Sequence, residues 1–151
     1  MEDCMNVVKD DGLFEGKKSA EGCLEPQVKI PAAPNFPDDV DWKSINPDLM
    51  FKLLSFPTEI EDGNRMIDAT EIISTPPNYR DWFDERKLHY CNFGLMALKL
   101  SKELSEKYGI KKKKYNDWNP AEDFSNELKT VASRRNLRTE EHKAFVKRVL
   151  G

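Results

Sequence analysis

The sequence is poor in glycine, cysteine and histidine, from which many catalytic and metal sites are built. It contains seven glycines, three cysteines and two histidines among 151 residues. The glycines are scattered, so they form neither a phosphate-binding loop nor a dinucleotide fingerprint. A nucleophile elbow and an HExxH zinc helix are also missing. The reaction classes that have a recognisable sequence motif therefore find no support in this chain. We expect no enzymatic activity, no metal and no cofactor.

His89 and Cys91 are the one close pair of soft metal ligands. A structural zinc ion needs four ligands, usually arranged as two tight pairs, and the remaining candidates (Cys4, Cys23 and His142) lie far away in the sequence. Residues two positions apart on a helix do not face each other, so the pair is also a poor nucleophile and base. We expect Cys91 to be a small core residue.

The sequence also lacks a hydrophobic run long enough to cross a bilayer, which takes about 20 residues. Its most apolar window, Phe93 to Leu100, is short and contains Lys99. The first twenty residues have neither the basic start nor the apolar stretch of a secretory signal. Three cysteines make no even disulfide framework, which fits a reducing compartment. We predict a protein of the cytoplasm, the nucleus or both, with no membrane insertion.

Proline is concentrated near the amino terminus. Four of the nine prolines lie between positions 26 and 37, and proline both lacks an N–H donor and restricts the preceding residue to extended conformations. We therefore predict two parts: an extended or disordered, acidic, Pro-rich arm (residues 1–40) and a helical domain with a basic C-terminal part (residues 41–151). Apolar side chains in and beside the arm, Ile30, Phe36 and Trp42, can pack on a partner or on the chain's own fold.

Helical signals recur through residues 41–151. Asparagine caps, prolines at first helical positions and a terminal glycine mark the expected starts and ends. The predicted helices cover residues 47–56, 66–73, 78–108, 120–136 and 139–150. Gly94 marks either a weak point in the long helix or the junction of two helices near Asn92, and the β-branched Ile72–Ile73 also permits a strand. Each helix is too short to be stable alone, so we predict an all-α small bundle of about five or six helices.

Charge is distributed unevenly along the chain. Residues 107–151 carry twelve Lys and Arg against six Asp and Glu, whereas residues 1–106 carry twelve against twenty-one. A basic end on an acidic protein indicates an acidic partner, nucleic acid, or contact with the chain's own acidic half. The acidic pair Asp84–Glu85 is expected near a helix start, where it complements the helix dipole.

The most conspicuous polar feature is the run Lys111–Lys114, with Tyr115 and Trp118 close behind it. Lysines release counterions from a phosphate backbone, and neighbouring aromatic rings can stack on unpaired bases. The same residues suit an acidic protein surface, a nuclear localisation signal or an ordinary solvated loop.

These features predict a non-enzymatic adaptor or scaffold subunit of a larger intracellular assembly. In this hypothesis the N-terminal arm and the basic C-terminal helices bind protein partners. The alternative is a nucleic-acid-binding protein that uses the Lys111–Lys114 loop and the C-terminal helices. The residues predicted to contact a partner are Ile30, Phe36, Trp42, Lys111, Lys112, Lys113, Lys114, Tyr115, Trp118, Arg134, Arg135 and Arg138.

Overall fold

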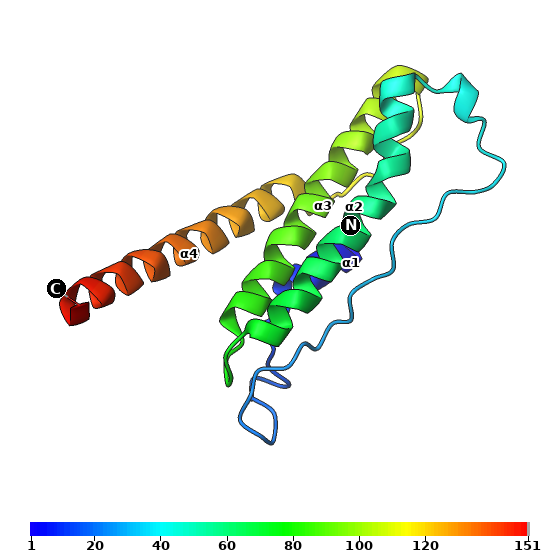
Figure 1. Ribbon diagram of the computed structural model, residues 1–151. Coiled ribbons are helices and arrows are strands. Elements are labelled where there is room, and N and C mark those ends of the chain that lie inside the picture. The colour runs from blue at the N-terminus through cyan, green and yellow to red at the C-terminus, as the bar shows by residue number, and fades with distance from the viewer. Residues whose placement is uncertain (151) are drawn as a thin grey trace.

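The computed structural model describes residues 1–150 and is built of helices (Figure 1). Its elements are α1 (Glu2–Lys9), the short 3-10 helix η1 (Trp42–Ser44), α2 (Pro47–Ile73), α3 (Arg80–Tyr108) and α4 (Pro120–Leu150). Within residues 1–150 the one β-type pairing is an isolated bridge between Phe14 and Lys17. The all-α prediction is confirmed, but the described chain has four α-helices rather than five or six.

The difference in helix number arises first in α2, which continues through Pro57 and Gly63. The sequence predicted an end at the first and an interruption at the second. Proline inside a helix costs about 3 kcal/mol, through a lost hydrogen bond and a clash with the preceding turn. Burial of one large aliphatic or aromatic side chain contributes about 1.5–3 kcal/mol, and α2 buries five of them on the face that packs against α3. Those five are Leu49, Leu53, Phe56, Ile60 and Ile67.

Two glycines allow the helices to approach closely. A Cβ on Gly63 of α2 would lie 2.4 Å from the Phe93 ring, and a Cβ on Gly94 of α3 would lie 2.4 Å from the Phe124 ring of α4. Both positions interrupted the helical pattern in the sequence. In the structure they are contact points between continuous helices, because only glycine leaves room for these rings.

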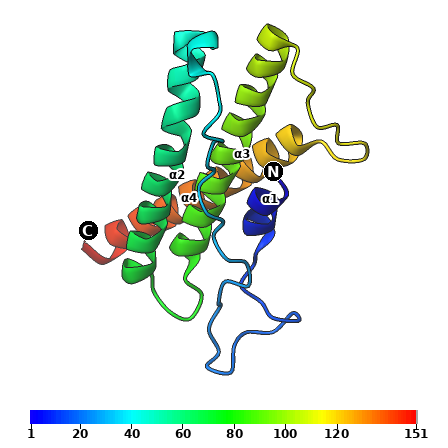
Figure 2. The same ribbon diagram turned by 90° about the vertical axis from the view of Figure 1, so that its right-hand side faces the viewer.

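Helix α4 is also continuous, although Asn136 and Thr139 suggested an end and a new start. Thr139 does not cap a helix; its Oγ1 donates to the Arg135 carbonyl 3.0 Å away, inside the helix. The first half of α4 buries Phe124 and Val131 and crosses α3, and its C-terminal end projects away from the other helices (Figures 1 and 2).

The amino-terminal arm is ordered along the bundle rather than extended throughout. Residues 2–9 form α1, which the sequence did not predict, and it buries Met5, Val7 and Val8 against the core. Residues 10–41 then run without a regular helix along α2 and α3 to the start of α2 (Figure 2). The eight residues of α1 are too few for a stable helix in isolation, so its buried apolar side chains must stabilise it.

A buried ion pair fixes the arm to α3. The Arg86 Nη2 lies 3.2 Å from Asp10 Oδ2, and both side chains are almost inaccessible to solvent. Asp10 also accepts backbone N–H bonds from Gly12, Gln27 and Val28. Arg86 donates a further bond of 2.7 Å to the Val28 carbonyl. One carboxylate and one guanidinium thus join α1, the arm and α3.

Several predicted helix ends are confirmed. Asn46 Oδ1 accepts the Leu49 N–H at 3.3 Å, and Asn119 Oδ1 accepts the Glu122 N–H at the same distance. Gly109 ends α3 in the left-handed conformation, with φ of 66°. Among residues 1–150, no helix combines the length and apolar character that a membrane crossing requires.

Candidate functional site

The loop between α3 and α4 borders a wide depression, here termed the lysine hollow. Its volume is about 1470 Å³. It is lined by residues 111–121, by Met1 and by Ala97, Leu98, Ser101 and Lys102 of α3. Five lysines and one aspartate line it, and two of the lysines, Lys102 and Lys113, pair with Glu106 and Glu2 just outside it. The hollow therefore combines an apolar floor with a strongly positive border.

The lysines of the hollow differ in how they are held. Lys113 Nζ lies 2.6 Å from Glu2 Oε1, a contact that ties the loop to α1, raises the pKa of Lys113 and lowers the pKa of Glu2. Lys111, Lys112 and Lys114 are exposed and have no carboxylate within 4.0 Å among residues 1–150. Three lysines that line the hollow therefore have no acidic partner within the described residues.

An aromatic pair forms one wall of the hollow. The Tyr115 and Trp118 rings meet edge to face with centroids 5.0 Å apart. Trp118 Nε1 donates to Asp123 Oδ2 at 2.8 Å, which fixes the indole against the start of α4. Lys113 Nζ lies 5.6 Å from the centre of the Tyr115 ring. The structure thus brings the predicted lysines and aromatics together. The two aromatic rings are half-buried and pack against each other.

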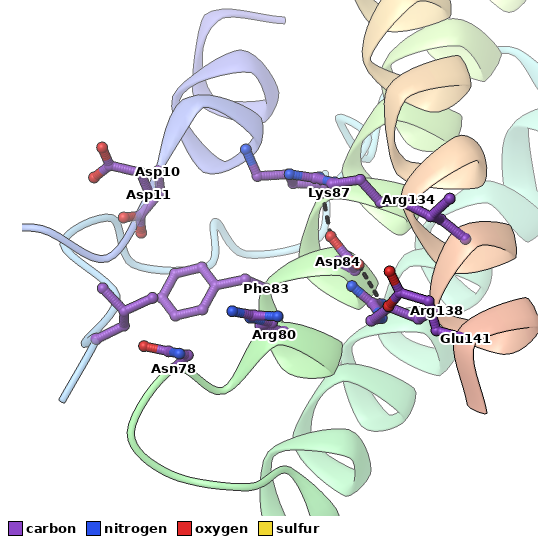
Figure 3. A pocket seen from close by; sticks show the side chains of 12 residues that line it. Asp10, Asp11, Asn78, Arg80, Phe83, Asp84, Lys87, Arg134, Arg138 and Glu141 are labelled. Atoms are coloured by element: carbon purple, nitrogen blue, oxygen red, sulfur yellow. Dashed lines mark hydrogen bonds and ion pairs between the residues drawn. The ribbon is translucent and has the colours of Figure 1, made fainter. Parts of the chain in front are cut away.

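A second cavity, of about 420 Å³, lies beside α3 and α4 near the end of α1 (Figure 3). In Figure 3 the Asp84 side chain points toward the α4 arginines. Four acidic and four basic side chains line this cavity, so their formal charges cancel: Asp10, Asp11, Asp84 and Glu141 against Arg80, Lys87, Arg134 and Arg138. A cavity that neutralises its own charges has little attraction for a strongly charged ligand.

The predicted partner-binding arginines of α4 contact the chain's own acidic residues. Asp84 is buried and receives Arg134 at 3.0 Å and Arg138 at 2.6 Å. Arg135 pairs with Glu85, which the His89 ring also contacts. The sequence explained Asp84–Glu85 by the helix dipole, whereas the structure gives both residues arginine partners on α4. The sequence analysis considered an acidic partner, nucleic acid or the chain's own acidic half for the basic end. These three arginines contact the last of these.

The predicted contact residues of the arm also lie against the chain itself. Ile30, Phe36 and Trp42 are half-buried and pack on the core. The Phe36 and Trp42 rings meet edge to face with centroids 5.2 Å apart. The sequence left open whether these side chains pack on a partner or on the chain itself, and in the structure they pack on the chain's own core. The lysine loop touches the arm through Lys113–Glu2 and borders a pocket that Phe36 and Lys111 both line, whereas Arg134, Arg135 and Arg138 pair with α3 instead.

Cys91 and His89 do not form a reactive pair. Cys91 is fully buried, and burial raises the pKa of its thiol to about 12. The thiolate is the reactive form of cysteine, so this side chain is suited to packing. His89 Nε2 lies 3.1 Å from Glu85 Oε1 instead. Within residues 1–150, no three His, Cys, Asp or Glu side chains lie close enough together to hold a metal ion.

The sequence did not identify Lys102 as part of the hollow or Asp84 as a buried partner of arginine. Asp81, Asp84 and Glu85 recur at helical spacing, as do Arg134, Arg135 and Arg138, and this matched spacing could have indicated two facing helices. Comparison with protein-family models, curated proteins and solved structures gives no significant match. The assignment of function therefore depends on the lysine hollow.

Proposed function

We propose that the chain is a non-enzymatic adaptor subunit of a cytoplasmic or nuclear assembly, which binds an acidic segment of a partner protein in the lysine hollow. The observation that carries this proposal is the set of three exposed lysines without carboxylate partners, Lys111, Lys112 and Lys114, beside a half-buried aromatic wall. Carboxylates of the partner would meet these ammonium groups. An apolar side chain between them would lie on the floor of Ala97 and Leu98.

The charge distribution favours an acidic peptide over a long nucleic acid. Nucleic-acid binding needs cations distributed along the backbone of the ligand. Here the positive border is confined to one loop and Lys102, because the α4 arginines are neutralised by α3. The formal net charge of the whole chain is -3, which repels a polyanion approaching elsewhere.

A pull-down from nuclease-treated lysate, read by mass spectrometry, tests the proposal. The altered chain carries Lys111→Gln, Lys112→Gln and Lys114→Gln. The matched control carries Lys17→Gln, Lys29→Gln and Lys43→Gln, which remove the same charge from exposed sites outside the hollow. We expect a defined protein set that the control retains and the hollow variant loses. If both variants retain the same set, the hollow is not the binding surface.

Nucleic-acid binding is the second candidate, because Tyr115 and Trp118 stand beside the lysines as stacking aromatics do in single-strand-binding proteins. It requires measurable affinity for a labelled single-stranded oligonucleotide of about 16 nucleotides. That affinity would fall steeply as salt rises from about 50 to about 200 mM, and it would be lost in the hollow variant. Absence of binding at the lower salt concentration would dispose of this candidate.

A further inference from the structure

Helix α2 carries a second apolar stripe on the side opposite its core face. Phe51, Leu54, Met66, Ile72 and Ile73 are all exposed, Ile72 to 85% and Ile73 to 80%. At 3.6 residues per turn these five side chains fall within an arc of about 120°, and the buried residues of α2 project from the other side of the helix. We term this arc the outer stripe; it extends for about 33 Å, from Phe51 to Ile73.

No other element of the bundle covers this stripe. Among the described helices, α2 packs against α3, and the other helix contacts join α1, α3 and α4 to one another. The stripe is not uniformly apolar: its middle carries Thr58, Asp62 and Arg65, and the last two form an ion pair. Apolar ends around a charged centre are poorly suited to a lipid surface, which would have to desolvate the charges.

One edge of the stripe is self-complementary. Leu54, Glu61, Arg65 and Ile72 occupy one edge of it, within about 40° of arc. Leu54 and Ile72 are equally distant from the level of residue 63, and so are Glu61 and Arg65. If a second copy of α2 lies antiparallel across that level, each Leu54 meets Ile72 of the other copy, and each Glu61 meets its Arg65. An isologous two-fold interface places the same patch of both subunits in contact in this way.

We infer that the outer stripe of α2 is a self-association surface, on which α2 of a second copy packs antiparallel. A single helix pair is narrow, so the contact lies at the small end of interface sizes and the dimer is weak, with a dissociation constant in the micromolar to millimolar range. The surface is distinct from the lysine hollow, which is lined by residues of α3, the following loop and the start of α4.

Sedimentation velocity of the full chain over about 10–500 µM tests this inference, since that range covers weak dimers. We expect the dimer fraction to rise with concentration. Ile72→Asp should weaken dimerisation about tenfold or more, because the substitution occurs twice in the interface. The matched control is Phe145→Asp, which also replaces an exposed apolar residue with an acidic one, but on α4. Because both positions are exposed, both variants should melt like the unaltered chain.

A charge exchange tests the antiparallel register itself. Arg65→Glu places two glutamates opposite each other in both halves of the interface and should weaken dimerisation about three- to tenfold. The double variant Glu61→Arg, Arg65→Glu restores opposite charges and should recover the original affinity. A chain that stays monomeric at every concentration overturns the inference. So does a dimer that Phe145→Asp disrupts and Ile72→Asp does not, or one that the charge exchange fails to rescue.

Discussion

Two buried titratable side chains make the stability of the chain depend on alkaline pH. Burial raises the pKa of Cys91 from 9.0 to about 12 and the pKa of Tyr90 from 10.0 to about 12. The folded chain therefore keeps protons that the unfolded chain releases. This stabilisation is complete below pH 9 and is lost as the pH rises toward 12.

We expect the free energy of unfolding, measured with urea at a series of pH values, to fall above pH 9. Cys91→Ala should make the fall between pH 9 and pH 10 shallower without abolishing it, since burial raises the pKa of the Cys4 thiol as well. Tyr90→Phe should leave that interval unchanged and flatten the fall above pH 10. Parallel curves for all three chains would show that neither side chain is responsible.

The ion pair of Asp10 with Arg86 illustrates what residue-level interpretation could not provide. Its members are 76 positions apart, and neither lies in a pattern that indicates burial. Desolvation lowers the pKa of Arg86, and the contact with Asp10 opposes that change. The sequence predicted a proline-rich segment in an extended conformation, but the anchor that holds it depends on tertiary contacts.

At the scale of elements, the contact between α3 and α4 depends on Asp84. Its carboxylate is 5% exposed and binds two arginines of α4, whereas the neighbouring Asp81 is 70% exposed and binds only Arg138. Asp84→Asn removes a charge that two guanidinium groups share. We expect it to reduce the free energy of unfolding by about 2 kcal/mol, because hydrogen bonds to charged groups are worth about 1.5–3 kcal/mol each.

The matched substitution is Asp81→Asn on the same helix. Exposed ion pairs contribute about 0–1 kcal/mol, so this change should cost less than about 0.5 kcal/mol. Urea unfolding of the three chains compares the two positions. Equal losses at Asp81 and Asp84 would mean that burial of the carboxylate does not strengthen the α3–α4 contact.

Helix ends marked by a local cap were predictable, whereas the continuity of α2 and α4 was not. Asn46, Asn119 and Gly109 act through hydrogen bonds or backbone angles within a few residues, so the sequence contains the whole signal. Pro57 and Asn136 are local signals for termination. Burial along α2 outweighs the first, and α4 continues past the second as it extends over α3. Their outcome depends on which helix lies opposite, which periodicity alone does not reveal.

At the scale of the molecule, the charge asymmetry resolves into two parts. Arg134, Arg135 and Arg138 of α4 form ion pairs with Asp84 and Glu85 of α3, whereas Lys111, Lys112 and Lys114 have no acidic partner within the described residues. The lysine loop was predictable because four consecutive lysines cannot be buried and must face solvent. The fate of the arginines was not, because their partners lie about fifty positions earlier in the chain. The candidate site is therefore smaller than the basic segment.

The arm is part of the folded unit, so its removal should unfold the bundle. Deleting residues 1–41 removes Met5, Val7 and Val8 from the core and leaves Arg86 without its carboxylate. Loss of one partner of a buried ion pair costs about 3–5 kcal/mol, a large share of the stability of a small domain. We expect the shortened chain to lose its cooperative thermal transition in far-ultraviolet circular dichroism.

Two point substitutions separate packing from the presence of the arm. Val8→Ala, at a fully buried position, should cost about 2 kcal/mol through the cavity it leaves. Phe14→Ser, in the same arm but 64% exposed, should change stability by less than about 0.5 kcal/mol. A shortened chain that melts with unchanged midpoint and cooperativity would show that residues 42–151 fold alone. If the shortened chain unfolds, its failure to bind a partner would reflect unfolding rather than loss of a contact surface. The lysine variants are then the proper test of binding.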